Sequence, residues 1–372
     1  MSLTPHRAWR IMHSESSTGW GGQEHRIVAE LAGFHKRGSR VWLLTPPEAQ
    51  ISRKATEQQL AVVPLGAGRL RFPFAVVWAA RCLREQRVEI LNTHSSRDGW
   101  IVGLAGRLAR VPLLIRTRHI DVDYPRRWLS RYAYTTLADH VLATSEAITR
   151  HLQVLFGLPP DRITTVPTGI DVGRFSPDGR KADLVKPQGS PALPLVGMVS
   201  VLRSWKGHTT FLQAARSLQD TGFPARYVIV GEGPMRPAIE AQVAELGLTE
   251  LVTLTGHRDD VPGVLRALSV LIIASTRHEG VPQIGLQALA TRTPVVGSDA
   301  GGTPEVIRPG ETGRIFPAGD AAALAEAIRE TITNREATRT LCERGRARVE
   351  VRHSLEAMLD KLEALYQRSR PG

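Results

Sequence analysis

Short apolar runs alternate with longer amphipathic stretches along the whole chain. In the first half, the runs that predict strands are Ala8–Met12, Arg40–Leu44, Ala61–Pro64, Val88–Asn92, Leu113–Thr117, His140–Ala143 and Ile163–Val166. In the second half they are Leu195–Ser200, Tyr227–Val230, Val252–Thr255, Val270–Ala274, Pro294–Ser298 and Arg314–Phe316. Helical periodicity separates several of the first-half runs, at Glu24–Lys36, Ala75–Glu85 and Glu146–Leu155. Nearly continuous apolar strands with helices between them predict parallel sheets covered on both faces, an α/β fold.

A segment rich in proline and glycine interrupts this rhythm. Residues 174–194 contain four prolines and two glycines, which is typical of a linker. With 372 residues in all, the chain predicts an N-terminal domain over 1–174, a linker over 175–194 and a C-terminal domain over 195–355. Residues 356–372 predict a C-terminal helix that could pack back on the N-terminal domain. Doubly wound domains bind ligands at the carboxyl ends of their strands, so we expect the site in a cleft between the two.

The composition is that of an ordinary globular protein. Apolar residues make up 42% and charged residues 23%, and no apolar run approaches the ~20 residues needed to span a bilayer. The N-terminal residues 1–7 lack the apolar stretch of a secretory signal. Cys82 and Cys342 are too far apart for a metal knuckle and too few for a disulfide framework. These features predict a soluble cytoplasmic protein.

Positive charge is concentrated in the first half of the chain. Residues 1–174 hold 24 Lys and Arg against 14 Asp and Glu, a net charge of +10, whereas the rest of the chain has a net charge of +2. This imbalance favours an anionic partner for the first half: a nucleic acid, a phosphorylated substrate or an anionic lipid. A solvated arginine-rich surface explains it equally well.

Two glycine-rich turns are weak indications of a phosphate site. Gly19-Trp-Gly-Gly22 lies between the first predicted strand and a helix, where backbone N–H groups can approach a phosphate. Many such turns only connect a strand to a helix. Gly231-Glu-Gly233 resembles a shortened dinucleotide fingerprint, but it lacks the third glycine and Pro234 follows, which argues against a NAD site.

The segment from Ser275 to Ala290 is the stronger indication. A buried strand ends near Ser275, a turn with Gly280 and Pro282 follows, and a helix is expected to begin near Gln283. This order directs amide groups and a helix dipole toward the expected cleft, where they could hold a diphosphate. Glu279 precedes the turn and could accept hydrogen bonds from sugar hydroxyls. A second glycine-rich element, Asp299–Glu305, follows in the sequence.

These segments resemble retaining glycosyltransferases of the GT-B fold, family 4 (GT4), the lipopolysaccharide and O-antigen type of group 1. In the second half the matching segments are Lys206-Gly207, Val230–Pro234, Thr255-Gly256, Glu279-Gly280, Thr293–Val296, Gly301–Glu305 and Gly310–Gly313. In the first half they are Gly21–Glu24, Thr117–His119, Thr144-Ser145 and Val166–Asp171. The match is colinear over most of the chain. It implies two doubly wound Rossmann-like domains that face each other across a cleft.

The resemblance implies roles for several residues of the second half. Glu279 resembles the first acid of the family's paired-acid motif, which contacts the transferred sugar, and Lys206 resembles a lysine that contacts the donor phosphates. Gln287 stands where the family usually has a glutamate on the ribose hydroxyls, so the charge-assisted part of that bond is lost. The family usually has an arginine five residues before this lysine, and in this chain that position is Val201. Either Arg203 replaces that arginine from a shifted position, or phosphate neutralisation is weaker.

Two histidines of the first half are also candidates. His119 resembles the family's histidine near the reacting sugar, and His94 is a second, weaker candidate for the cleft. A lone histidine at a strand end is otherwise often structural. The remaining residues expected at the donor are Gly21, Gly22, Gly256, Val281, Pro282, Gln283 and Ile284.

Departure of the leaving group from a nucleotide sugar builds negative charge on a diphosphate, which a metal ion or cations with oriented amides must stabilise. Asp121-Val-Asp123 matches a metal-binding pattern of the other major glycosyltransferase fold, but such a pair is more often a turn. We therefore expect stabilisation without a metal and no cofactor. Arg203, Lys206, the Gly21–Gly22 amides and the helix near Gln283 would provide it. The family is retaining, which implies that the acceptor hydroxyl attacks the same face of the sugar from which the leaving group departs.

The basic first domain is expected to bind the acceptor. Residues 124–132 interleave aromatic residues with Arg126, Arg127 and Arg131 around Trp128, and residues 69–74 form a second such segment. These segments could lie against anionic headgroups, where each cation contributes about 1 kcal/mol, or they could be solvated faces. Arginine and aromatic residues also interleave at nucleic-acid sites, but no nucleic-acid module is recognisable.

Taken together, the sequence predicts a retaining, metal-independent glycosyltransferase, peripheral on the inner face of the plasma membrane. It would move a sugar from a nucleotide donor, a UDP-sugar rather than a GDP-sugar, to a lipid-linked or lipopolysaccharide-type glycan. One alternative is a nucleotide-sugar epimerase of the same fold. Another is a non-catalytic nucleotide-sugar-binding subunit, which the departures at Gln287 and Val201 suggest.

Overall fold

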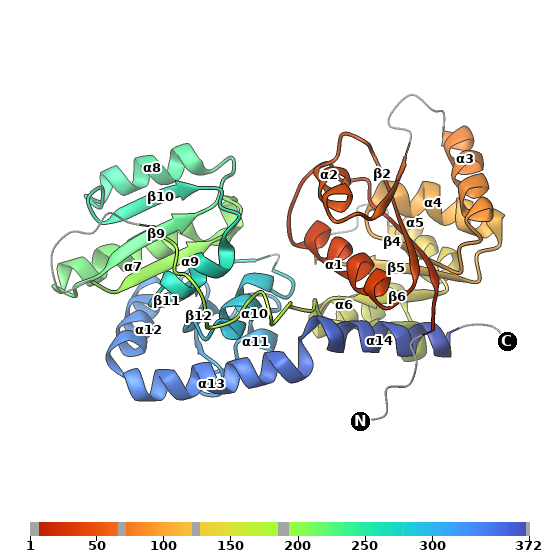
Figure 1. Cartoon of the computed structure of the whole chain (residues 1–372). Helices are drawn as coiled ribbons and strands as arrows, with labels where there is room; N and C mark the ends of the chain where they lie inside the picture. The colour runs from red at the N-terminus through yellow and green to blue at the C-terminus, as the bar shows by residue number, and fades with distance from the viewer. Residues whose placement is uncertain (1–6, 66–71, 121–126, 185–192, 278, 370–372) are drawn as a thin grey trace. The chain divides into compact units, whose positions relative to one another are not determined.

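The computed structural model describes residues 7–65, 72–120, 127–184, 193–277 and 279–369 (Figure 1). The chain forms two compact units. The first comprises Met1–Gly169 together with Leu355–Gly372, and the second comprises Ile170–Ser354.

The first unit is a seven-stranded parallel sheet with helices on both faces. The strands are β1 (Arg10–Ser14), β2 (Arg40–Thr45), β3 (Ala61–Pro64), β4 (Ile90–Thr93), β5 (Leu113–Arg118), β6 (His140–Ala143) and β7 (Ile163–Thr165). Their order is β3-β2-β1-β4-β5-β6-β7. The helices are α1 (Gly22–Lys36), α2 (Gln50–Glu57), α3 (Phe72–Glu85), α4 (Ser96–Ala109), α5 (Arg127–Tyr132), the π-helical η1 (Ala133–Leu137), α6 (Glu146–Phe156), the 3₁₀ turn η2 (Pro160–Arg162) and α14 (Leu355–Arg368).

Two apolar clusters sandwich this sheet. On one face α1, α2 and α14 bury residues such as Ile27, Leu31 and Leu359 against Ile11 and Ile115. On the other face, α3 and α4 pack against strand residues such as Met12, Leu91 and Leu114, whose side chains point to the side of the sheet opposite Ile11 and Ile115. Burial on both faces explains why the strands read as continuous apolar runs.

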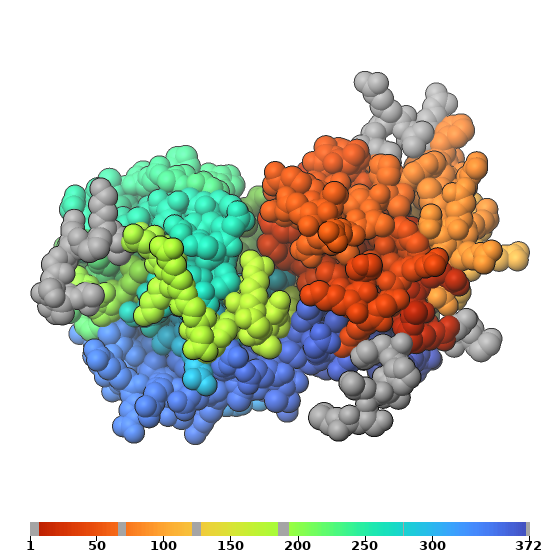
Figure 2. Space-filling view, viewed as in Figure 1, coloured from red at the N-terminus to blue at the C-terminus, as the bar shows by residue number. Residues whose placement is uncertain are grey.

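The last helix of the chain belongs to the first unit. In α14 the residues Met358, Leu359, Leu362, Leu365 and Tyr366 are buried in the same cluster as α1. The close approach of the two helices depends on Gly33, because a Cβ atom at that position would lie 2.4 Å from a methyl carbon of Leu359. The blue atoms of α14 lie against the red atoms of α1 in the space-filling view (Figure 2).

The second unit is a six-stranded parallel sheet of the same type. The strands are β8 (Leu195–Val199), β9 (Arg226–Val230), β10 (Val252–Gly256), β11 (Val270–Ile273), β12 (Val295–Ser298) and β13 (Arg314–Phe316), in the order β10-β9-β8-β11-β12-β13. The helices are the 3₁₀ turn η3 (Ser204–Lys206), α7 (His208–Asp220), α8 (Arg236–Glu245), α9 (Val261–Ala267), α10 (Gln283–Ala290), α11 (Thr303–Val306), α12 (Ala321–Thr333) and α13 (Arg335–Arg352). The packed faces carry α7, α8 and α12 on one side and α9, α10 and α13 on the other.

The first part of the expected linker packs on the second unit. Phe175 and Leu184 are buried in its core, and the Ala182 amide donates to the Gly263 carbonyl oxygen at 2.9 Å. Residues 185–192, which hold two of the four prolines, lie outside the described residues.

The sequence pattern located every strand of the two sheets. Three of the predicted runs, Ala61–Pro64, His140–Ala143 and Arg314–Phe316, coincide with β3, β6 and β13, and the other ten differ by one or two residues at an end. The prediction of two doubly wound parallel sheets is confirmed. In each order the strand sequence reverses once, between β1 and β4 and between β8 and β11, and ligands bind at such points.

Candidate functional site

In the second unit, a charged pair lies at the point where the strand order reverses. Lys206 follows β8 and Glu279 follows β11, and these two strands are neighbours in the sheet. The Lys206 Nζ atom lies 2.6 Å from Oε2 of Glu279, and both side chains are largely buried. The Ser275 hydroxyl donates to the same oxygen at 2.5 Å. The structure thus brings together the expected sugar contact and the expected phosphate contact.

Glycines allow the backbone segments of this site to approach one another. Gly301 has φ +57°, and a Cβ atom there would lie 2.1 Å from the carbonyl oxygen of Glu279. The next amide, of Gly302, donates to that same carbonyl oxygen at 3.0 Å. Gly207 has φ +75°, and a Cβ atom there would lie 1.8 Å from the Ala274 carbonyl oxygen. Only glycine fits both positions, so the Gly301-Gly302 element holds Glu279 in place.

The helix α10 begins where the sequence predicts, at Gln283, with Pro282 as its N-cap. The turn residues Val281 and Pro282 lead into the first helical turn at Gln283 and Ile284. The amide groups of a first helical turn point out of the end of the helix, so this end of α10 can bind an anion. Gln287 lies one turn further on and is half-buried. Its side-chain amide makes no hydrogen bond within the part of the chain that the structure describes.

Two other expected donor contacts have different surroundings from this pair. Arg203 is exposed, and its guanidinium carbon lies 5.7 Å from the ring centroid of Trp205. Gly256 ends β10 with φ +77°, and a Cβ atom there would meet Oε1 of Glu232 at 2.9 Å. Glu232 is itself paired with Arg236 at 2.6 Å. Gly256 therefore neighbours a different charged pair from the one at Glu279.

In the first unit, three buried histidines form a hydrogen-bonded row. His13 lies in β1, and His94 and His119 directly follow β4 and β5, so the three come from adjacent strands. Nδ1 of His94 lies 2.9 Å from Nε2 of His119, and Nε2 of His94 lies 3.0 Å from Nδ1 of His13. Burial lowers the pKa of His13 to about 4, and it lowers the pKa values of His94 and His119 well below their usual value. All three rings are therefore neutral at pH 7.

A buried ion pair on α1 ends this row. Nε of Arg26 lies 2.5 Å from Oε1 of Glu30, and neither side chain is exposed. Nη1 of Arg26 also donates to the carbonyl oxygen of Val166 at 2.6 Å. Oε2 of Glu30 lies 3.9 Å from Nε2 of His13. Among the described residues, neither of those last two atoms has a hydrogen-bond partner.

A pair of buried carboxyl groups lies beside the histidine row. Asp98 accepts hydrogen bonds from the Ser14 hydroxyl at 2.7 Å and from the His94 amide at 3.1 Å. Glu15 accepts from the Ser17 amide at 2.6 Å. Burial, followed by the Asp98 charge, raises the pKa of Glu15 to about 7, and burial also raises the pKa of Asp98. Burial therefore makes Glu15 hold its proton more tightly than an exposed glutamate does.

The structure changes the expectation for the first glycine-rich turn. Helix α1 does begin at Gly22 with Gly21 as its N-cap. However, the Gly21 amide donates to Oε2 of Glu24 at 2.9 Å, so a carboxylate occupies the place expected for a phosphate. A phosphate could use this amide only by displacing Glu24.

The described part of the acceptor segment is exposed. Trp128 on α5 is 73% exposed, and Arg131 and Tyr132 on the same helix are exposed as well. Phe74 and Val77 on α3 are 63% and 60% exposed. Arg126, Asp121 and Asp123 lie outside the described residues, and for Arg127 the structure describes the backbone within α5 alone.

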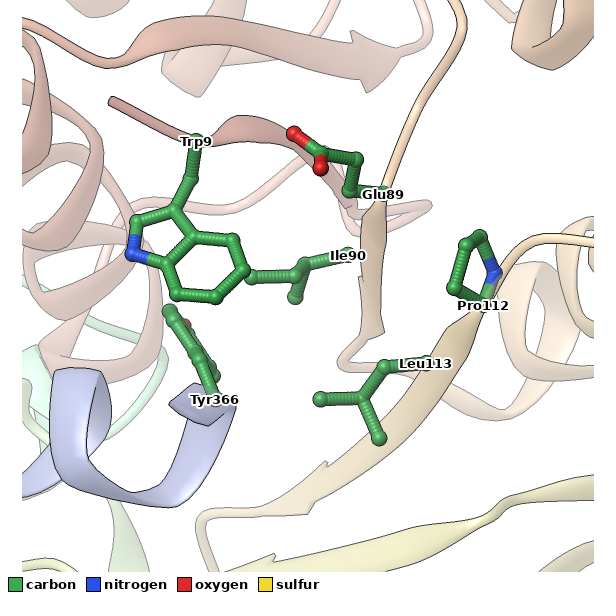
Figure 3. Close-up of a pocket in the computed structure, with 6 residues that line it drawn as sticks. All are labelled: Trp9, Glu89, Ile90, Pro112, Leu113 and Tyr366. Carbon is green, nitrogen blue, oxygen red and sulfur yellow. The ribbon is translucent and has the colours of Figure 1, made fainter. Parts of the chain in front are cut away.

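A crevice lies at the end of the first sheet opposite the histidine row, and its lining does not indicate a ligand site. It lies beside the amino ends of β1, β4 and β5 and is lined by Trp9, Glu89, Ile90, Pro112, Leu113 and Tyr366 (Figure 3). The Trp9 ring and the Tyr366 ring meet edge to face at 6.1 Å, and the space has no room for a water molecule. It is therefore packing space rather than a ligand site.

Neither a metal cluster nor a membrane helix is found in the described ranges. No three of the His, Cys, Asp and Glu side chains there are placed to hold a metal ion together. No helix among the same residues combines the length and the apolar character needed to cross a membrane.

Sequence reasoning missed His13, Glu30, Glu15 and Asp98. His94 and His119 were candidates, but they lie 25 residues apart in sequence and nothing in that spacing joins them. The available signal was the position of each histidine at the carboxyl end of an apolar run. The strand order, which makes β1, β4 and β5 neighbours, turns those three positions into one cluster.

Family models match both halves of the chain. The model described as Glycosyltransferase Family 4 matches residues 20–174, and the model described as Glycosyl transferases group 1 matches residues 193–334. The chain is 33% identical over 384 residues to the 2-deoxystreptamine N-acetyl-D-glucosaminyltransferase of Streptomyces fradiae, covering 90% of this chain and 89% of that protein. It is 24% identical to the UDP-Gal:alpha-D-GlcNAc-diphosphoundecaprenol alpha-1,3-galactosyltransferase of Escherichia coli, covering 77% of each.

Solved structures agree on the fold. The crystal structure of HepE from Anabaena in complex with UDP-glucose superposes with a TM-score of 0.81 at 19% identity, covering 96% of this chain and 99% of that one. The superposition spans both sheets of this chain, since it covers 96% of the residues. The chain belongs to the family 4, group 1 glycosyltransferases and is a glycosyltransferase of the GT-B fold.

Proposed function

We propose that this glycosyltransferase is retaining and metal-independent, and that it transfers a sugar from a UDP-sugar to a lipid-linked or lipopolysaccharide-type glycan. The observation that carries the proposal is the Lys206–Glu279 pair beside the first turn of α10. It places a cation, a carboxylate and helix amides together at the ligand-binding end of the second sheet.

Each part of this site has a task in the reaction. Lys206 and the α10 amides would bind the diphosphate and stabilise the charge that builds up as the sugar departs. Arg203, exposed on the same turn as Lys206, would add a second cation. Glu279 would then exchange its lysine partner for hydroxyls of the transferred sugar. Cations and fixed amides supply the stabilisation that a metal ion gives in other enzymes, so we propose that none is required.

Two of the compared proteins support the donor and the stereochemistry. The Anabaena protein is described as bound to UDP-glucose, and the Escherichia coli relative is named for UDP-Gal and an alpha product. UDP-hexoses are themselves alpha-linked, so an alpha product corresponds to retention. As the family resemblance implies, we propose that His119 takes part in the transfer.

The acceptor proposal rests on charge. The Escherichia coli relative is named for a diphosphoundecaprenol-linked acceptor, which is anionic and membrane-bound. Residues 1–174 carry a net charge of +10, and α5 and α3 expose Trp128 and Phe74. We propose that this surface lies against the anionic membrane that carries the acceptor, which would make the protein peripheral on the cytoplasmic face.

A second acceptor class deserves a direct test. The Streptomyces fradiae relative is named for 2-deoxystreptamine, a diamine, and it is 33% identical to this chain. A net charge of +10 in the first half would repel such a cation, so we favour the anionic acceptor.

The test is a donor and acceptor panel on the full-length protein. Calorimetry should show UDP binding more tightly than GDP or ADP, and binding should persist in excess EDTA. Transfer from a UDP-hexose to a diphosphate-linked lipid sugar should give an alpha product, identified by its anomeric proton coupling. A beta product would refute retention, and loss of activity in EDTA that manganese restores would refute metal independence. Transfer to 2-deoxystreptamine alone would replace the proposed acceptor.

A further inference from the structure

The histidine row of the first unit has a direction, which follows from counting its protons. Each neutral imidazole carries one N–H and one lone pair. In the row, both ring nitrogens of His94 are engaged, one by His119 and one by His13. Every hydrogen bond needs one N–H and one lone pair. The three protons must therefore sit either all on Nε2 atoms or all on Nδ1 atoms.

Glu30 selects between these two arrangements. Its Oε2 atom lies 3.9 Å from Nε2 of His13, and both atoms are buried without another partner among the described residues. With the protons on Nε2, His13 directs an N–H toward the carboxylate. With the protons on Nδ1, it would direct a lone pair toward a buried negative charge. The first arrangement is favoured, and low dielectric surroundings increase the difference.

The tautomer selected by Glu30 leaves one ring nitrogen of His119, at the other end of the row, without a proton. Its Nε2 atom is engaged by His94, while its Nδ1 atom makes no hydrogen bond to any residue that the structure describes. Nδ1 is therefore the nitrogen left for a ligand. We propose that Glu30 and His13, acting through His94, fix the tautomer of His119 so that it presents an unprotonated Nδ1 to a hydroxyl of the reacting sugar.

This arrangement suits the charge that develops during transfer, and it rests on the proposed retaining function. As the leaving group departs, positive charge builds on the sugar ring, so a protonated histidine nearby would oppose the reaction. A neutral ring with an outward lone pair accepts a hydrogen bond from a sugar hydroxyl instead. The aligned rings also pass the polarisation by Glu30 along the row, which makes Nδ1 a stronger acceptor. Glu30, His13 and His94 are positioning residues in this scheme.

Arg26 supplies the counter-charge for the buried Glu30 side chain. The Arg26 guanidinium pairs with Glu30 at 2.5 Å and donates to the Val166 carbonyl oxygen. Burial is the largest cause that lowers the pKa of all three histidines, and Arg26 lowers each of them as well, whereas Glu30 raises the pKa of His13. Burial therefore keeps the row uncharged, and the ion pair supplies the carboxylate that orients it.

Nitrogen-15 NMR of the full-length protein, labelled at histidine, tests the proposal without requiring activity. Long-range proton–nitrogen correlation at pH 7.5 should show His13, His94 and His119 with a proton on Nε2. The His119→Gln variant identifies the His119 signals. In Glu30→Gln, the bias should disappear and His119 should populate the Nδ1-protonated form. The matched control is Glu363→Gln, another buried glutamate of the first unit that pairs with an arginine, Arg37 at 3.2 Å. It should leave the His119 signals unchanged.

Kinetics then connect the tautomer with transfer. Glu30→Gln should lower kcat by ~10-fold or more and leave KM for the donor nearly unchanged, as expected when a residue orients a reacting histidine. If Glu30→Gln does not fold, the double variant Arg26→Met/Glu30→Leu removes the pair without leaving a buried cation. A proton on Nδ1 of His119 in the wild type, or an unchanged tautomer in both variants, overturns the proposal. A confirmed tautomer in a protein without transferase activity would instead refute the proposed function.

Discussion

At the scale of single residues, the candidate site in the second unit is an ion pair that is already formed in the absence of ligand. Lys206 and Glu279 satisfy each other before a donor arrives, and Ser275 holds the carboxylate in place. Under the proposed function, a diphosphate would compete with Glu279 for the lysine. The pair keeps both charges ready in a largely buried place where either charge alone would be costly.

Glu279→Gln should lower kcat/KM by ~10-fold or more, a loss of about 1.4 kcal/mol of transition-state stabilisation, with little change in UDP affinity. The amide can keep the Ser275 bond but loses the charge that faces the developing positive sugar. Steady-state kinetics and calorimetry give the two quantities. Glu240→Gln, on the exposed face of α8, is the control and should match the wild type. Unchanged turnover in Glu279→Gln would remove this residue from the site.

Lys206→Met should weaken UDP binding by at least ~10-fold, because it removes a charge-assisted bond worth roughly 1.5–3 kcal/mol. Met keeps the apolar stem of the side chain. Arg203→Met should weaken binding by less, because Arg203 is exposed and its charge is screened by water. Calorimetry at two salt concentrations measures both effects. Equal affinity of Arg203→Met and the wild type would show that Arg203 does not replace the arginine absent at Val201.

At the scale of elements, glycine turns control where the Glu279 side chain lies. Gly301→Ala should destabilise the protein and reduce turnover, because its Cβ would lie 2.1 Å from the Glu279 carbonyl oxygen. Gly310→Ala is the matched control, since Gly310 has φ +72° and no atom lies within 4 Å of the added Cβ. This variant should lower the free energy of unfolding only by the ~1 kcal/mol that an alanine costs in the left-handed backbone region. Thermal unfolding and kinetics separate the two. Similar losses in both variants would show that strain, and not contact with Glu279, explains the effect.

The elements themselves were largely readable from the sequence, and the histidine row was not. Strands such as His140–Ala143 were predicted because burial on both faces leaves a local apolar signature. The row of His13, His94 and His119 depends on which strands are neighbours, a long-range property that no local pattern encodes. The Glu24 carboxylate on the Gly21 amide is a similar case. A glycine-rich turn before a helix was recognisable, but the side chain that fills it was not.

At the scale of the whole molecule, buried neutral histidines make stability depend on pH. Burial lowers the pKa of His13, His140 and His208 to about 4, and it lowers those of His94 and His119 well below their usual value. Because their folded-state pKa values lie below the unfolded value of 6.5, their contribution is complete above pH 6.5 and is lost as pH falls toward 4. The raised pKa of Glu15, about 7, acts in the opposite direction between pH 4.5 and 7, and the raised pKa of Asp98 acts in the same direction as that of Glu15.

Five histidines outweigh these two carboxyl groups, so the free energy of unfolding should fall as the pH is lowered from 7.5 to 5.5. Each net proton contributes about 1.4 kcal/mol per pH unit. His140→Gln should reduce the slope by about one proton, since His140 pairs with Thr164 and lies outside the histidine row. Urea unfolding at a series of pH values measures this. A protein equally stable at both pH values would contradict the burial of the neutral rings.

The charge asymmetry of the chain gives the last prediction. If the net charge of +10 on residues 1–174 serves a membrane, the protein should co-sediment with vesicles of anionic lipid and not with neutral ones. Binding should fade as salt shortens the screening length from ~10 Å at 0.1 M to ~3 Å at 1 M. The triple variant Arg126→Ala/Arg127→Ala/Arg131→Ala should weaken it by up to ~3 kcal/mol, while UDP binding by the second unit stays unchanged. The control Arg335→Ala/Arg339→Ala/Arg344→Ala removes the same charge from exposed positions of α13 and should sediment like the wild type. Equal losses in the two triple variants would mean that net charge alone attracts the vesicles. Unchanged vesicle binding by the Arg126/Arg127/Arg131 variant would mean that this segment is a solvated face and does not bind the membrane.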